Sequence, residues 1–278
     1  KITSFEAEYK IGDNTYSQTF ETNMASNETK QFTFDQDAYL TPNKYDLNIN
    51  ITSVNGKEDQ DITNNTLTKE INVALSSTQR IPMIEHFSSA SCAPCVSVNN
   101  MMHKLTESNP GKYTYVKYPV KWPGLGDPYA TNECKTRVDY YEVQNAPELY
   151  LDGTSQGYSV VTPDALNAAY GTPTYADIRG AFNVEGNIIT VTADFMSYIA
   201  MDSVRAYISV NEKTTTENAS TNGEKEFHHI TMKMLESPEG NIINIKAGEY
   251  TRLEFSYDME KSFMEEINDL EVALWLQN

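Results

Sequence analysis

The stretch IPMIEHFSSASCAPCVSVNNMMHKL, residues 81–105, decides the expected fold of this chain. Arg80 to Phe87 reads as a buried strand, and Val96 to Leu105 carries an apolar stripe at helical spacing. Between them stand Cys92 and Cys95, two thiols separated by two residues at the start of the helix. The free N–H groups and the positive dipole end of a helix stabilise a thiolate and lower its pKa. The spacing therefore predicts a thiol–disulfide motif at a strand-to-helix junction.

Strands and helices continue to alternate after this motif. A second strand is predicted at Tyr113 to Tyr118, followed by a Pro- and Gly-rich connection and a helix from Tyr129 to Tyr141. A third strand, Glu148 to Leu151, ends at a turn that leads into a short partner strand at Gln156 to Val161. Thr162 is a predicted N-cap with proline after it, which starts a last helix. The expected order is β-α-β-α-β-β-α.

This order, the CxxC motif and the pair Ala146-Pro147 directly before the third strand together resemble the thioredoxin fold. The resemblance covers Ile81 to about Tyr170. It implies that the bond before Pro147 is cis and that its loop lies against the disulfide of Cys92 and Cys95. The proline makes the signal more specific than the CxxC spacing alone.

Further residues narrow the resemblance. The chain is similar to the thioredoxin-like module of a Bacteroidetes outer-membrane protein family named for a member of about 28 kDa. The residues that carry this similarity are Trp122-Pro123-Gly124, Asp127-Pro128-Tyr129, Arg137, Tyr140-Tyr141, and Ala146-Pro147 through Asp152-Gly153. The run Asn222-Gly223-Glu224 through Lys233-Met234-Leu235 looks like that family's C-terminal β domain. Members are mostly secreted or lipid-anchored, and some are discussed as surface adhesins or receptors.

The regions on either side of this module are rich in predicted strands. Residues 1–76 predict an immunoglobulin-like β-sandwich, with one strand at Gln31 to Phe34 and turns such as Asn55-Gly56. Residues 77–173 form the expected thioredoxin-like domain, and residues 174–278 a second sandwich. The expected fold class is α+β multidomain, with a central thioredoxin-like α/β domain flanked by N-terminal immunoglobulin-like and C-terminal β-sandwich domains.

Composition restricts the partners. The chain has 21 basic and 39 acidic side chains, a formal net charge of −18, which argues against nucleic acid and against an anionic membrane surface. Mean hydropathy is −0.53 and no long apolar run occurs, so no transmembrane segment is predicted. The chain starts at Lys1 without an initiator Met, which we interpret as a mature or trimmed form, and a lipid anchor upstream stays open. Three cysteines, two of them in one motif, do not make a structural disulfide framework.

Four residues are assigned to the reaction. Cys92 is the expected attacking thiolate, Cys95 resolves the mixed disulfide, and Pro147 shapes the site. His86 lies six residues before Cys92, where thioredoxins often carry a buried acid that relays protons. An imidazole does the same work near neutral pH, and a plain packing role for His86 is the alternative.

Other residues are candidates for substrate contact. Ser91 stands where thioredoxins usually have Trp, so the substrate groove is expected to differ from theirs. Trp122 supplies an aromatic rim, with a core position as the alternative, and Ala146 is the second candidate substrate-binding residue. Cys134 shares a helical stripe with Val138, which predicts a buried and unreactive thiol.

No pattern predicts a metal or a cofactor. His228 and His229 are adjacent on a predicted strand and face opposite sides, so they do not chelate one ion. The acidic run from Glu58 to Asp61 lacks the ordered spacing of a calcium loop. No Ser-His-Asp set or phosphate-binding glycine loop stands out, so hydrolase and nucleotide-binding functions have no support.

Two functions from different classes remain, and whether the protein is an enzyme is left open between them. The first is an extracytoplasmic thiol-disulfide oxidoreductase that acts on protein thiols and disulfides in the periplasm, at the outer membrane or at the cell surface. The second is a surface-exposed binding or adhesion protein in which the thioredoxin fold is a scaffold without turnover. The first requires an exposed Cys92 with a lowered pKa, whereas the second tolerates a buried or permanently oxidised pair.

Overall fold

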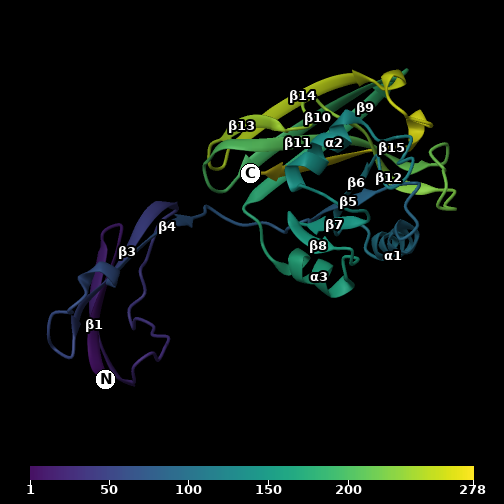
Figure 1. Cartoon of the computed structure of the whole chain (residues 1–278). Coiled ribbons are helices and arrows are strands. Elements are labelled where there is room, and N and C mark those ends of the chain that lie inside the picture. The colour runs from purple at the N-terminus through teal and green to yellow at the C-terminus, as the bar shows by residue number, and fades with distance from the viewer. The chain divides into compact units, whose positions relative to one another are not determined.

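A computed structural model describes all 278 residues, which form two compact units, Lys1–Leu75 and Ser76–Asn278. Strands account for most of the regular structure of both units (Figure 1). The three α-helices belong to the second unit: α1 (Cys95–Glu107), α2 (Asn132–Tyr141) and α3 (Pro163–Gly171). None of these helices is long and apolar enough to cross a membrane.

The first unit is one antiparallel sheet with the strand order β2-β1-β3-β4. Its elements are β1 (Ile2–Ile11), β2 (Asn14–Met24), β3 (Asn43–Val54), the 3-10 turn η1 (Ile62–Asn64) and β4 (Thr66–Val73). Alternation along β1 places Phe5 and Tyr9 on the same face. The segment between β2 and β3 covers them: Phe32 packs edge-on against Phe5 with ring centroids 4.8 Å apart, and Phe34 against Tyr9 at 5.1 Å. A loop, rather than a second sheet, therefore covers this part of the face.

In the second unit, the strands around the CxxC motif belong to the same sheet as strands near the C-terminus. The order is β13-β11-β12-β6-β5-β7-β8, and β15 also pairs with β11. These strands are β5 (Met83–Ser88), β6 (Thr114–Pro119), β7 (Glu148–Leu151), β8 (Thr154–Gly157), β11 (Met201–Thr215), β12 (Phe227–Met234), β13 (Asn241–Ile245) and β15 (Leu270–Gln277). The junction is a parallel pairing of β12 with β6 at Ile230 and Lys117. The Thr231 hydroxyl reinforces it by donating to the Lys117 carbonyl oxygen at 3.0 Å.

A smaller sheet, β14-β10-β9, packs against the C-terminal strands of the large one. It consists of β9 (Ala176–Glu185), β10 (Ile188–Ser197) and β14 (Tyr250–Asp258), and the 3-10 turns η2 (Met259–Lys261) and η3 (Ile267–Asp269) follow. The core between the two sheets contains Val191 and Phe195 from β10 and Ala206 and Ile208 from β11, all fully buried. This core extends to Ala90, which lies two residues before Cys92 in the chain.

The helices cover both faces of β5, β6 and β7 (Figure 1). On one face, Met102 of α1 and Leu166 of α3 share a core with Ile84. On the other face, Cys134 of α2 shares a core with Phe87 and with Tyr118 of β6. Because side chains alternate along a strand, neighbouring residues of β5 enter different cores.

The expected fold class is wrong. Strands make up 47% of the chain and helices 15%, and no separate central thioredoxin-like α/β domain lies between two sandwiches. The physical reason is the edge of β6: a free strand edge leaves unpaired N–H and C=O groups, and β12 pairs with it. The first unit is not an immunoglobulin-like sandwich either, because Gln31–Phe34 forms no strand and a single sheet results.

The local order of elements agrees with the sequence between Met83 and Gly171. β5, α1, β6, α2, β7, β8 and α3 follow one another as expected. α2 begins at Asn132, later than predicted, because the Thr131 hydroxyl accepts the Cys134 N–H and caps the helix. The division of the chain at residues 76 and 173 into three domains stays a prediction.

Candidate functional site

Cys92 and Cys95 form a disulfide at the start of α1, with their Cα atoms 5.3 Å apart. Cys95 is the first helical residue, and its backbone N–H donates to Cys92 Sγ at 3.2 Å. Cys92 Sγ also lies 3.4 Å from the carbonyl oxygen of Ala146, and the bond between Ala146 and Pro147 is cis. The fold thus brings together four of the six sequence-predicted site residues, namely Cys92, Cys95, Ala146 and Pro147.

The disulfide is closed off from solvent. Cys92 and Cys95 both have an exposed fraction of 0%, whereas Ala93 and Pro94 between them are exposed. Residues 88–101, which surround the motif in the chain, include no charged side chain. Within this segment, the positive end of the α1 dipole is therefore the source of electrostatic stabilisation for a thiolate. Any further charge near the sulfur atoms comes from other segments of the chain.

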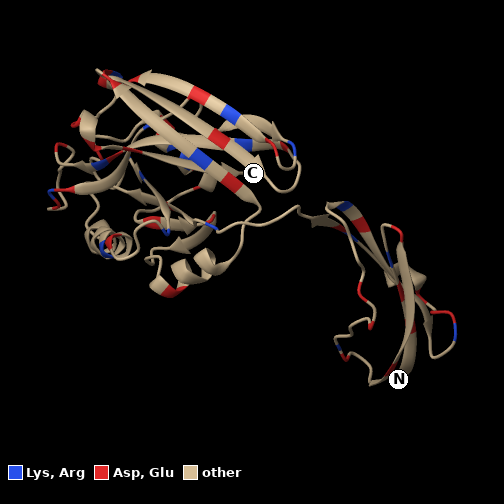
Figure 2. Cartoon of the chain, turned by 180° about the vertical axis from the view of Figure 1, so that it is seen from behind, with Lys and Arg blue, Asp and Glu red and all other residues tan.

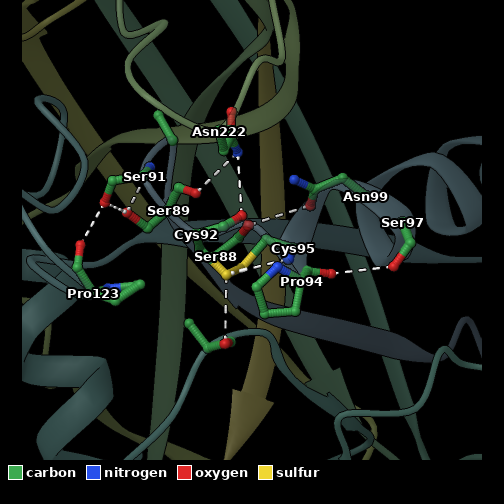
Figure 3. Close-up of a disulfide and its surroundings, with 12 residues drawn as sticks. Ser88, Ser89, Ser91, Cys92, Pro94, Cys95, Ser97, Asn99, Pro123 and Asn222 are labelled. Atoms are coloured by element: carbon green, nitrogen blue, oxygen red, sulfur yellow. Dashed lines mark hydrogen bonds between the residues drawn. A yellow bond between two sulfur atoms is a disulfide. The ribbon is translucent and has the colours of Figure 1, made fainter.

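A loop from the C-terminal strands binds the backbone of the CxxC segment. It joins β11 to β12, and its Asn222 donates from the backbone N–H to Ala90 O at 3.1 Å. The Asn222 side chain donates from Nδ2 to Ser89 O at 3.4 Å and to Cys92 O at 3.3 Å (Figure 3). Sequence reasoning missed Asn222 as a contact of the motif because the two lie 130 residues apart, which leaves no local signal.

Glu224 ties the same loop to α1. Its carboxylate accepts hydrogen bonds from Asn99 Nδ2 at 3.0 Å and from Asn222 Nδ2 at 2.6 Å. Asn99 follows Cys95 by one helical turn, and its Oδ1 accepts the Ser88 hydroxyl at 3.3 Å. Asn99, Asn222 and Glu224, hereafter the amide clamp, thus hold the loop against both ends of the CxxC segment.

A second connection approaches the motif from β6. The Ser91 hydroxyl donates to the Pro123 carbonyl oxygen at 2.5 Å, and the bond between Trp122 and Pro123 is cis. The Trp122 ring is half-buried and packs with Ala146 against the core that includes Phe87. Its Nε1–H is buried without a hydrogen-bond partner. Trp122 and Ala146 therefore border the same core.

His86 is fully buried on the face of β5 that packs under α1. Its Nδ1 lies 2.6 Å from the Tyr115 hydroxyl oxygen, and its Nε2 has no hydrogen-bond partner. Burial holds the pKa of His86 well below its usual range, and the neighbouring Lys117 charge acts in the same direction. The imidazole is therefore neutral near pH 7, with one ring nitrogen unpaired.

Lys117 lies beside His86, in register with it across β5 and β6. Only 3% of Lys117 is exposed, and burial lowers its pKa to about 8, although the charges of Glu224 and Asp127 act to raise it. Asp127 is buried as well, which raises its pKa, and its carboxylate accepts the Ala90 N–H at 2.8 Å. We did not single out Lys117 from the sequence, although a lysine inside the aromatic run Tyr113 to Tyr118 is an available signal.

The third cysteine lies apart from this site. Cys134 is on α2, which covers the opposite face of the sheet from α1, and it is 1% exposed. Burial raises the pKa of its thiol to about 11, and the Thr131 hydroxyl lies 3.3 Å from its sulfur. This confirms the prediction that Cys134 is buried, and the raised pKa of the thiol agrees with low reactivity.

The histidines make separate contacts. His228 stacks on His103 of α1 with ring centroids 4.0 Å apart, and His229 Nδ1 lies 2.6 Å from a carboxylate oxygen of Glu271. No group of three or more His, Cys, Asp or Glu side chains is arranged to hold a metal ion.

Comparisons with known proteins bear on the fold alone. No family model matches the sequence, and no curated protein matches it. Among solved structures, HBP35 of Porphyromonas gingivalis is similar with a TM-score of 0.57 and 16% identity, over 72% of this chain and 70% of that one. A second structure, protein AGR_C_4864 from Agrobacterium tumefaciens, has a TM-score of 0.47 and 13% identity, over 65% of this chain and 80% of that one. The first likeness loosely fits the Bacteroidetes part of the sequence resemblance, and at this identity it shows a shared fold only.

Proposed function

We propose that the Cys92–Cys95 pair carries out thiol–disulfide exchange with protein thiols and disulfides, with Cys92 as the attacking thiolate and Cys95 as the resolving thiol. The observation that carries this proposal is the position of the pair at the N-terminus of α1, against the Ala146-Pro147 segment. The Cys95 N–H aimed at Cys92 Sγ is a donor for a thiolate, so it favours a lowered Cys92 pKa in the reduced state.

The chemistry is a balanced two-step exchange. The Cys92 thiolate attacks one sulfur of a substrate disulfide, which forms a mixed disulfide and releases one substrate thiolate. Cys95 loses its proton and attacks Cys92 Sγ, which closes the Cys92–Cys95 bond and releases the second substrate thiolate. Two electrons pass from the protein dithiol to the substrate, and the reverse sequence oxidises a substrate dithiol.

We assign His86 and Lys117 to proton transfer during the second step. Both lie on the face of the sheet that α1 covers, and neither is saturated by hydrogen bonds or ion pairs. A lysine with a pKa of about 8 exchanges protons near physiological pH, whereas the pKa of His86 is held well below its usual range, so the neutral imidazole takes up a proton only transiently. Pro147 and Ala146 in this proposal line the place where a substrate backbone lies beside Cys92, with Trp122 at its margin.

A purely structural role explains the disulfide less well. The bond closes a loop of a few residues, for which the entropy model gives about 2 kcal/mol of stabilisation, against about 4.7 kcal/mol for a loop of about 100 residues. We place this exchange outside the cytoplasm, in the periplasm, at the outer membrane or at the cell surface, as the sequence resemblance implies.

One observation favours the second function, a surface-exposed binding or adhesion protein without turnover. Both sulfur atoms are inaccessible, since the exposed fraction of each cysteine is 0%. A disulfide that stays buried against the Ala146 carbonyl is compatible with a scaffold that holds binding surfaces elsewhere. Exchange therefore requires the segments around the two sulfur atoms to move, and the titration below tests whether they do.

The test is a redox titration of the native protein against a glutathione series, with alkylation of Cys92 followed against pH. Exchange predicts a reduction potential between about −120 and −270 mV and a Cys92 pKa well below about 8.5. Cys92→Ser should abolish exchange with a disulfide-containing peptide, Cys95→Ser should trap the mixed disulfide, and the control Cys134→Ser should behave as wild type. A pair that stays oxidised in excess dithiothreitol while the protein is folded would sink the proposal and favour the binding function.

A further inference from the structure

The charges around the disulfide come from residues outside the CxxC segment. Asp127 accepts the Ala90 N–H, Glu224 accepts amide hydrogens of Asn99 and Asn222, and Lys117 interacts electrostatically with both carboxylates. These three charged residues comprise one cation and two carboxylates. The sum of these three charges is −1 when all three groups are ionised.

Only one of the three charged groups is open to an incoming molecule. Lys117 is 3% exposed and Asp127 is 7% exposed, whereas Glu224 is partly exposed. The hydrogen-bond donors to the Glu224 side chain are the neutral amides of Asn99 and Asn222. A carboxylate held by neutral donors keeps its full charge and gains from a cationic partner.

The surrounding loop is acidic as well. Between β11 and β12, residues 216–226 contain three glutamates and one lysine. Across the chain, acidic residues outnumber basic ones and are distributed over strands and loops (Figure 2). A positively charged substrate is therefore attracted to this side of the motif, and an anionic one is repelled.

From these contacts we infer that the exchange site prefers positively charged thiol and disulfide substrates, and that Glu224 is the residue that sets the preference. The inference rests on the proposed function and adds the charge class of the substrate to it. A substrate ammonium or guanidinium that pairs with Glu224 takes the place of the Asn222 amide. Because Asn222 Nδ2 also donates to Ser89 O and Cys92 O, the same pairing alters the contact of the loop with the backbone of the CxxC segment.

The size of the effect follows from the exposure of Glu224. A partly exposed ion pair changes a rate constant by about 1.4-fold to 5-fold, and salt screens it over a Debye length of about 10 Å at 0.1 M. The preference is therefore expected to be a few-fold at low ionic strength and to fall as salt is added.

Three small disulfides of different charge test the inference: cystamine, with two ammonium groups, hydroxyethyl disulfide, which is neutral, and dithiodiglycolate, with two carboxylates. The reduced protein is mixed with each, and the second-order rate constant for formation of the Cys92–Cys95 disulfide is measured. Each reaction converts one protein dithiol and one reagent disulfide into one protein disulfide and two reagent thiols. Because the reagents differ in intrinsic reactivity, the quantity compared is the cystamine to hydroxyethyl disulfide rate ratio of each variant, relative to wild type.

Glu224→Gln removes the charge and keeps the shape, so we expect its ratio to fall about 3-fold to 5-fold. Glu226→Gln is the matched control, because it lies on the same loop, is exposed and makes the same change in net charge. Its ratio should stay within about 1.5-fold of wild type. Glu224→Asp keeps the charge and should retain a preference for cystamine. Raising the salt from about 0.02 to about 0.5 M should bring the wild-type ratio toward that of Glu224→Gln.

The outcomes separate this inference from the proposed function. If wild type reacts with all three reagents and Glu224→Gln leaves the ratio unchanged, the charge preference is overturned and exchange stands. The same holds if Glu224→Gln speeds all three reagents equally, since Glu224 then acts only through the contact of the loop with the CxxC backbone. If reduced wild type reacts with none of the reagents, both proposals fail.

Discussion

The two faces of β5 carry two buried polar groups that are built in different ways. Glu85 points toward α2 and accepts hydrogen bonds from Tyr118 Oη at 3.0 Å, Arg137 Nη2 at 2.6 Å and Tyr141 Oη at 2.5 Å. Its neighbour His86 points toward α1, where it is hydrogen-bonded to Tyr115 alone and one ring nitrogen lacks a partner. The first group is saturated, and the second is not.

We interpret the saturated network on the α2 side as structural, and the unsaturated groups on the α1 side as available for chemistry. Arg137 is 0% exposed, pairs with Glu85 and lies over the rings of Tyr140 and Tyr207, so its charge is compensated from several directions. On the α1 side, burial of His86 and Lys117 removes them from water, and their few hydrogen-bonding and charged partners do not offset this desolvation. Polar groups buried at such a cost are concentrated at functional sites, and here they lie on the side of the sheet that carries the disulfide.

The largest expected effect breaks the saturated network. Arg137→Ala leaves Glu85 buried without its cation, and we expect it to lower the free energy of unfolding by about 3–5 kcal/mol, measured by urea denaturation of the oxidised protein. The control is Arg252→Ala, which removes an exposed pair with Asp194 and should cost no more than about 1 kcal/mol. Equal losses for the two variants would show that the α2-side network is not the stronger one.

Part of this comparison was predictable from the sequence. Strand alternation places Glu85 and His86 on opposite faces, and the burial of Cys134 followed from its helical stripe. The pairing of Glu85 with Arg137 was not predictable, because the two residues are 52 positions apart and only the packed fold shows their distance. The position of Lys117 beside His86 depends in the same way on parallel pairing of β5 and β6.

For the fold as well, local features were predictable from the sequence and long-range pairings were not. Local patterns located the strands and helices from Met83 to Gly171, because hydrophobic period, caps and turns are written into neighbouring residues. The pairing of β12 with β6 joins Ile230 to Lys117, and no local pattern specifies which edge a distant strand will cover. The amide clamp was missed for that reason, because it depends on where β12 begins.

A smaller effect, of opposite sign, sharpens the comparison. Lys117→Met removes a buried cation whose burial is not offset by an ion pair, so we expect it to raise the free energy of unfolding by about 1–3 kcal/mol at pH 7. The pKa of Lys117 in the folded protein is about 8, below the usual lysine value of 10.5, so the free-energy cost of its buried charge is fully present below pH 8. It is relieved as pH rises from 8 to 10.5, and the advantage of the variant should shrink over that range.

Urea denaturation of wild type and Lys117→Met at pH 7 and pH 9.5 measures this difference. Lys121→Met is the control, since Lys121 is exposed and its replacement should change the free energy of unfolding by less than about 0.5 kcal/mol. A loss of stability in Lys117→Met comparable to that of Arg137→Ala would mean that the α1 side is a second structural network, and the contrast between the faces would fail.

The smallest effect concerns a third titratable group on the α1 side. Burial lowers the pKa of His228 to about 4, and the stacked His103 acts in the same direction. Because this pKa lies below 6.5, the unfolded chain binds the proton first as pH falls. The stability that neutral His228 contributes is thus fully present above pH 6.5 and is lost as pH falls from 6.5 to 4. Since His228 is only half-buried, the loss at pH 5 should be below about 1 kcal/mol.

The measurement is the urea midpoint at pH 7 and pH 5 for wild type, His228→Gln and His103→Gln. His228→Gln should lose less stability between the two pH values than wild type does, since one proton-linked group is gone. His103→Gln should fall between them, because it removes one cause of the lowered His228 pKa and leaves the burial of His228 in place. If all three proteins show the same pH dependence, the stacked pair does not titrate as proposed. The polar groups on the α1 side would then be buried because of packing alone, whereas those beside α2 are held by hydrogen bonds and an ion pair.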